Sequence, residues 1–118
     1  MVEFLNTGNE KVLGTRVSGQ IDPQDLDEIK EIVAERMNRL INLNWYYEIM
    51  DFEGWEFSSF WRDVLFSLMN TEHFGKIAFV GKDTPPSIKS EVASVFTPAQ
   101  VKYFDIKEKK AALDWVVT

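Results

Sequence analysis

The pattern of apolar and polar residues predicts strands and helices arranged around the middle of the chain. A nearly continuous apolar and aromatic run over residues 45–52 predicts a central strand that is covered on both faces. After a short acidic turn, apolar side chains recur at three- and four-residue spacing, which predicts an amphipathic helix. Its core stripe is Phe57, Phe60, Trp61, Val64, Leu65 and Leu68. We expect the fold to be built around this strand, turn and helix.

The remaining elements follow from the same patterns. Strands over residues 2–6 and 11–18, with turn residues between them, predict an N-terminal antiparallel hairpin in which Gly14 is a candidate bulge. Asp22 and Pro23 have the residue types of a helix cap and a first helical position. The stripe of that helix is Leu26, Ile29, Val33, Met37 and Leu40. Strands over 76–80 and 101–104, a helix from Thr84 to before Pro98, and a helix over 107–117 complete the chain.

This order of elements predicts the fold class. A hairpin followed by alternating helices and strands indicates an α/β protein with right-handed crossovers. We expect one domain over residues 1–118, with a mostly parallel five-stranded sheet and about four helices. Since large aromatic side chains dominate cores, we expect Trp45, Trp61 and Trp115 to lie in the core.

Composition narrows the function classes. The net charge of −6 argues against nucleic acid and against an anionic membrane surface, because both need a basic patch. There are no cysteines and one histidine, His73, so we expect neither thiolate chemistry nor a metal site. No apolar run is long enough for membrane insertion, and a cytoplasmic location is the default. No glycine-rich nucleotide motif follows any strand, and no cofactor is expected.

Three carboxylates in and after the central strand are the candidates for chemistry. Glu48 interrupts the apolar run, and a paired or partly exposed structural role is favoured over a catalytic one. Asp51 and Glu53 follow, with Glu56 close by, so the start of the next helix is crowded with negative charge. That charge would repel an incoming phosphate and is typical of helix stabilisation rather than of a cation site.

The order of elements, the D-F-E-G-W sequence at 51–55 and the V-S-G sequence at 17–19 resemble the SpoIIAA-like family. The aromatic helix around Phe60 and Trp61 adds to the resemblance. This family belongs to the STAS superfold, which includes the anti-sigma-factor antagonists. The resemblance implies a STAS-like fold over nearly the whole chain. It also implies a phosphorylatable serine between an aspartate and a glycine, but here Phe52 and Glu53 stand between Asp51 and Gly54.

Three functions from different classes remain open. The first is a non-catalytic interaction or regulatory module that lacks the STAS phosphoserine and binds a protein partner or a second copy of itself. The second is a binder of a small apolar or lipid-like ligand, because the fold is similar to that of lipid-carrying CRAL-TRIO domains. The third is an enzyme with Glu48, Asp51 or Glu53 as general base. We rank them in that order and predict no enzyme. The candidate surface is Asp51, Phe52, Glu53, Gly54, Trp55, Ser59 and Phe66. Either both aromatic rings of Phe52 and Trp55 fold back onto the core, or at least one of them, Trp55 in preference, stays partly exposed as a binding anchor.

Overall fold

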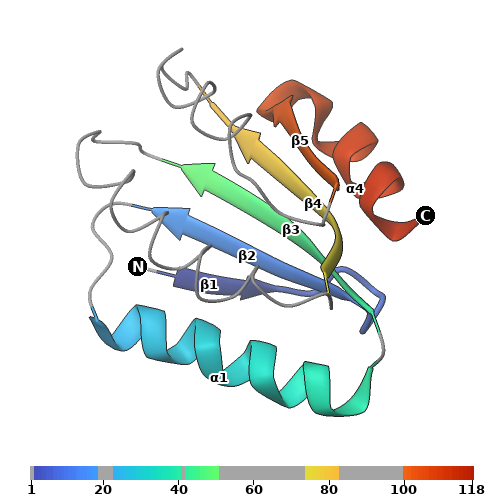
Figure 1. Ribbon diagram of the computed structural model, residues 1–118. Coiled ribbons are helices and arrows are strands. Elements are labelled where there is room, and N and C mark those ends of the chain that lie inside the picture. Colours follow the sequence, from blue (N-terminus) through green and yellow to red (C-terminus); the bar gives the residue numbers. More distant parts are fainter. Residues whose placement is uncertain (1, 19–22, 41, 51–73, 83–99) are drawn as a thin grey trace.

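The computed structural model describes residues 2–18, 23–40, 42–50, 74–82 and 100–118 (Figure 1). Within these ranges lie five strands, two α-helices and one short 3₁₀ helix. The strands are β1 (Val2–Leu5), β2 (Val12–Ser18), β3 (Leu43–Met50), β4 (Phe74–Gly81) and β5 (Gln100–Asp105). The helices are α1 (Pro23–Arg39), η1 (Ile106–Glu108) and α4 (Lys109–Val117).

The five strands form one sheet in the order β1-β2-β3-β4-β5. β1 pairs with β2 in antiparallel fashion, which confirms the predicted hairpin, and the other three pairings are parallel. The sheet is therefore mixed, and the α/β class predicted from the order of elements is confirmed. Because β2, β3, β4 and β5 run the same way, they all end at one edge of the sheet, called the carboxyl edge below.

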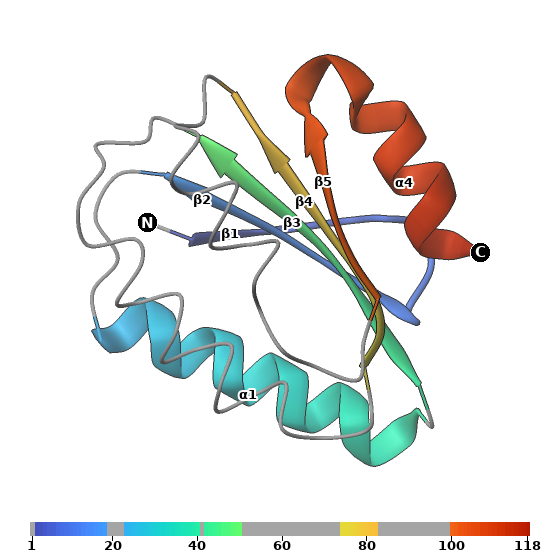
Figure 2. The ribbon, with the colours of Figure 1, turned by 45° about the horizontal axis from the view of Figure 1, so that its top comes forward.

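A helix lies on each face of the sheet. Figures 1 and 2 show α1 beneath β1, β2 and β3, and α4 on the opposite face beside β4 and β5. β3 is buried on both faces, as its unbroken apolar run predicted. The core on the α1 side is Leu13, Val17, Ile29, Val33, Leu43, Trp45, Tyr47, Ile49, Phe74, Ile77 and Phe79. The core on the α4 side is Val12, Tyr46, Ala78, Val80, Phe104, Ala112 and Val116.

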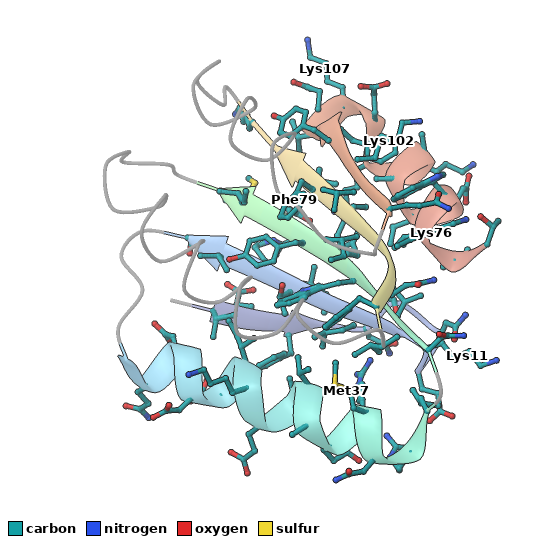
Figure 3. All side chains as sticks on the ribbon, viewed as in Figure 1. Lys11, Met37, Lys76, Phe79, Lys102 and Lys107 are labelled. Carbon is teal, nitrogen blue, oxygen red and sulfur yellow. The ribbon has the colours of Figure 1, made fainter. Side chains whose placement is uncertain are left out.

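The amphipathic pattern of α1 orients it on the sheet. Ile29 and Val33 are fully buried, and Met37 is half-buried and extends from α1 toward the sheet (Figure 3). In the last turn, Arg36 Nη1 donates hydrogen bonds to the backbone oxygens of Glu10 (3.2 Å) and Val12 (3.0 Å). These bonds attach the end of α1 to the turn before β2. Asp22, the predicted cap, and the Leu26 side chain lie outside what the structure describes.

The described ranges contain two α-helices rather than about four. The two further helices, predicted from Phe57 and from Thr84, fall in ranges that the structure does not describe. Of the three tryptophans expected in the core, Trp45 is fully buried and Trp115 is half-buried against the α4-side core. Trp61 lies outside the described residues.

Gly14 is not a bulge. It pairs with Leu5 on one side and Tyr46 on the other in an unbroken register. A Cβ atom at Gly14 would lie 2.8 Å from Thr7 Cγ2, so the turn that returns to β2 passes too close for a side chain. The irregularity in the sheet lies between β3 and β4 instead, where the register shifts beside Gly75. A Cβ atom at Gly75 would lie 2.7 Å from the side-chain oxygen of Asn44.

The C-terminal end of α4 is attached to the starts of β3 and β4. Asn44 Nδ2 donates to the backbone oxygen of Val116 (2.7 Å), and Asn44 Oδ1 accepts from the backbone N–H of Lys76 (2.9 Å). Lys76 Nζ donates to the backbone oxygen of Trp115 (3.3 Å) and lies 5.4 Å from the centre of its ring. Figure 3 shows Lys76 beside this end of the helix. A cation there satisfies carbonyls that the helix leaves open and opposes the negative end of its dipole.

Candidate functional site

We expect the predicted site at the carboxyl edge, where α/β folds place their sites. Residue 51 follows directly after Met50, the last residue of β3. All seven residues of the candidate surface, from Asp51 to Phe66, lie outside the described residues, as does His73. Of the three candidate carboxylates, the structure describes Glu48.

Glu48 is a buried carboxylate in a network of polar side chains near the carboxyl edge. Its side chain is 2% exposed. Arg16 Nε donates to Oε1 at 3.1 Å, and the hydroxyl group of Tyr46 donates to Oε2 at 3.1 Å. Lys109 Nζ lies 3.9 Å from Oε2, and Arg16 Nη1 lies 3.5 Å from Glu3 Oε2. We call these five residues the Glu48 network.

The strand register brings the network together. Arg16 of β2 pairs directly with Glu48 of β3, and Tyr46 precedes Glu48 by two residues, so their side chains share the α4 face of the sheet. Lys109 is the first residue of α4 and reaches the same carboxylate. Glu3 comes from β1, where it pairs with Arg16. Two cations and a hydroxyl group thus compensate a charge that would be costly to bury alone.

The same contacts shift the pKa values of two partners. The hydrogen bond and the negative charge of Glu48 raise the pKa of the Arg16 guanidinium. Burial, followed by the charge and the hydrogen bond of Glu48, raises the pKa of Tyr46 well above its usual value. Burial alone raises the pKa of Tyr47 on the opposite face. At neutral pH, Arg16 and Tyr46 therefore hold the protons that they donate to Glu48.

This geometry disfavours Glu48 as a general base. Both carboxylate oxygens already accept hydrogen bonds, and the side chain is almost completely covered. A general base needs a lone pair within reach of a substrate proton. The expectation that Glu48 is paired is confirmed.

Sequence reasoning missed the partners of Glu48. Arg16 lies in a predicted strand between Thr15 and Val17, as Glu48 lies in an apolar run. One charged residue of each sign, in two strands that follow one another in the chain, is a signal that the strands pair with these residues opposite each other. Lys109 gives no such signal, because lysines are common at the starts and ends of surface helices.

A second feature, a groove between β1 and α1, was also missed. It has a volume of about 330 Å³ and is lined by Phe4, Glu28, Glu31, Ile32 and Glu35. Phe4 is 43% exposed and lines this groove. The sequence shows a phenylalanine in a short strand and glutamates in a helix, but it does not show that they meet.

Two features are absent from the described residues. Among them, no group of three or more histidine, cysteine, aspartate or glutamate side chains is placed to hold a metal ion. No helix in the described ranges has the length and apolar character needed to cross a membrane.

Comparison with known proteins identifies the family. The family model described as SpoIIAA-like matches residues 12–117, which include β2, α1, β3, β4, β5, η1 and α4. The chain belongs to the SpoIIAA-like family. The resemblance seen in the sequence is confirmed, and the five-stranded sheet agrees with it. Membership in the SpoIIAA-like family indicates a regulatory or interaction domain. No curated protein and no solved structure matches the chain.

Proposed function

We propose that this SpoIIAA-like domain is a non-catalytic interaction module that binds a protein partner, or a second copy of itself, at the carboxyl edge of its sheet. The observation that supports this proposal is the Glu48 network. It places a buried carboxylate, paired with cations and hydrogen-bonded at both oxygens, just before the segment that begins at residue 51. Such a module needs no cofactor, and we expect it to work in the cytoplasm.

The network favours binding over catalysis for a physical reason. Glu48 joins β2, β3 and the start of α4 through a carboxylate whose two oxygens already accept hydrogen bonds. Groups held in this way give a rigid support to the residues that follow the strand, and the buried Glu48 carboxylate is poorly placed for proton transfer to a substrate. Binding residues are commonly carried by connecting segments that a rigid scaffold positions.

The binding surface that we propose is the one predicted from the sequence. Phe52 and Trp55 supply aromatic anchors beside the carboxylates of Asp51 and Glu53, with Gly54 between them. Ser59 and Phe66 extend it. Because no hydroxyl stands between Asp51 and Gly54, binding there cannot be switched by phosphorylation of a serine at the STAS position. The alternative, a small apolar or lipid-like ligand, stays a prediction.

Site-specific photo-crosslinking in the producing cells tests the proposal. A photoreactive amino acid replaces Trp55 in one variant and Val117 in a control, because Val117 is 42% exposed near the end of α4, away from the carboxyl edge. We expect a protein adduct of discrete mass, or a crosslinked dimer, at position 55 and none at 117. Native mass spectrometry that finds a bound small molecule, with no protein adduct at position 55, would overturn the proposal in favour of the ligand binder.

Trp55→Ser then separates binding from folding. We expect it to abolish the crosslinked interaction while the free energy of unfolding falls by less than about 1.5 kcal/mol, below the usual cost of emptying a core aromatic site. A loss of about 3–5 kcal/mol would place Trp55 in the core and contradict its role as an anchor.

A further inference from the structure

The groove between β1 and α1 combines an exposed ring with a row of acidic side chains. Phe4 and Ile32 supply its apolar surface, and Glu28, Glu31 and Glu35 line the helix side. These three glutamates follow one side of α1 because residues three and four apart are neighbours on a helix. Figures 1 and 2 show β1 as an edge strand of the sheet with α1 beneath it.

Phe4 is exposed because of the position of β1. In the described sheet, β1 has a neighbouring strand on one side only, and it is four residues long. Val2, on the same face of β1, packs partly against the core, whereas Phe4 overlies the groove. Phe4 and Val117 are the large hydrophobic side chains that are exposed in the described part of the chain, and of these two Phe4 lines the groove.

The negative charge along the groove is only partly compensated. Glu35 is held by Arg39, whose Nε lies 2.8 Å from Glu35 Oε1 and whose Nη1 also reaches Glu10. Within the described ranges, no ion pair involves Glu28 or Glu31. The groove therefore presents two uncompensated carboxylates directly beside an apolar surface.

We propose that this groove docks an extended segment of a protein partner that carries lysine or arginine side chains around one apolar anchor. The anchor packs on Phe4 and Ile32, and the basic side chains pair with Glu28 and Glu31. Charge complementarity selects this occupant, because the carboxylates repel nucleic acid and anionic lipid. The groove is a second surface, on a different part of the fold from the proposed surface at the carboxyl edge, and its role does not depend on that surface.

Fluorescence anisotropy with a labelled short peptide of alternating leucine and lysine tests the chemistry. We expect saturable binding that weakens as salt is raised, since exposed charge pairs are screened. Phe4→Ser should weaken binding about tenfold, the effect of losing a central anchor. Glu31→Gln should weaken it about two- to fivefold, the range expected for one exposed ion pair.

Matched controls separate docking from general attraction. Asp114→Asn removes the same unit of charge from α4 on the other face of the sheet and should leave binding unchanged. Peptides with serine in place of leucine, or with glutamate in place of lysine, should fail to bind. Equal weakening by Asp114→Asn and Glu31→Gln would overturn the inference, as would the absence of binding by the leucine–lysine peptide.

Crosslinking identifies the natural occupant. With the photoreactive residue at position 4, we expect an adduct whose crosslinked segment contains an apolar residue flanked by lysine or arginine. A crosslinked dimer at position 4 would mean that a second copy occupies the groove, and an adduct lacking basic residues would refute the charge argument. Adducts at position 55 but not at position 4 would leave the proposed function standing and would refute docking at the groove.

Discussion

The indole N–H of Trp45 donates a hydrogen bond to the hydroxyl oxygen of Thr15 at 2.9 Å, and both residues are fully buried. Thr15 lies on β2 and Trp45 on β3, both on the face that α1 covers. The ring of Trp45 also stacks on Phe74, with 5.7 Å between ring centres. The buried indole N–H of Trp45 thus relies on Thr15, in the neighbouring strand, as its hydrogen-bond acceptor.

Thr15→Val tests that dependence. Valine has nearly the shape of threonine but cannot accept the hydrogen bond, so the buried indole N–H loses its partner. We expect the free energy of unfolding in urea to fall by about 1–3 kcal/mol. Thr15→Ser keeps the acceptor and loses only a methyl group, about 1 kcal/mol. If serine proves more damaging than valine, methyl packing matters more here than the hydrogen bond.

Arg16→Met tests the Glu48 network. Methionine keeps much of the aliphatic stem but removes the donor to Glu48 Oε1 and leaves a buried carboxylate with fewer partners. We expect a loss of about 2–3 kcal/mol in urea unfolding, the cost of removing a hydrogen bond to a charged group. Combined with Glu48→Gln in a double-mutant cycle, it should show a coupling energy of about 1–3 kcal/mol. Strict additivity would show that the two side chains do not act as a pair.

Because the pKa values of Tyr46 and Tyr47 are raised in the folded protein, we expect the free energy of unfolding to fall at high pH. Burial raises both pKa values above the ordinary value of 10. Above pH 10 the unfolded chain releases these protons while the folded chain keeps them, so each tyrosine lowers the free energy of unfolding by about 1.4 kcal/mol per pH unit. Urea unfolding on both sides of pH 10 measures the slope, and Tyr46→Phe should make it shallower. Tyrosinate absorbance from both residues in the native protein near pH 10 would contradict the shift.

Asn44→Asp tests how α4 is attached. Aspartate can still accept from the backbone N–H of Lys76, but it cannot donate to Val116, and it places a negative charge at the negative end of the helix dipole. We expect a loss of about 1–3 kcal/mol in thermal or urea unfolding. Asp114→Asn, an opposite charge change on the exposed side of α4, should be close to neutral. An unchanged stability for Asn44→Asp would show that this contact contributes nothing.

Much of the fold was predictable because its signals are local. The aromatic run before Met50 predicted a strand buried on both faces, and the structure places β3 there. The stripe through Ile29 and Val33 predicted the buried side of α1. Such patterns depend on residues that are close in the sequence, which is why they can be read without the structure.

The interactions of Glu48 and Phe4 were less predictable because they join distant segments. The Glu48 network depends on a strand register that pairs residue 16 with residue 48 and on a helix that begins sixty-one residues after Glu48, at Lys109. The groove depends on β1 lying at the end of the sheet, next to α1. Gly14 shows the same limit: a glycine in a strand favours a bulge from sequence alone, but here the close approach of Thr7 accounts for it.

The contacts at both ends of α4 affect how the native protein unfolds locally. Lys109 ties its first turn to Glu48, and Asn44 and Lys76 hold its last turn, so neither end can fray without breaking a contact to a central strand. The helix has nine residues, too few to be stable alone in water. Its backbone amides should therefore exchange with solvent at rates set by opening of β3 and β4, as part of one cooperative unit, whereas those of the short strand β1 should exchange earlier.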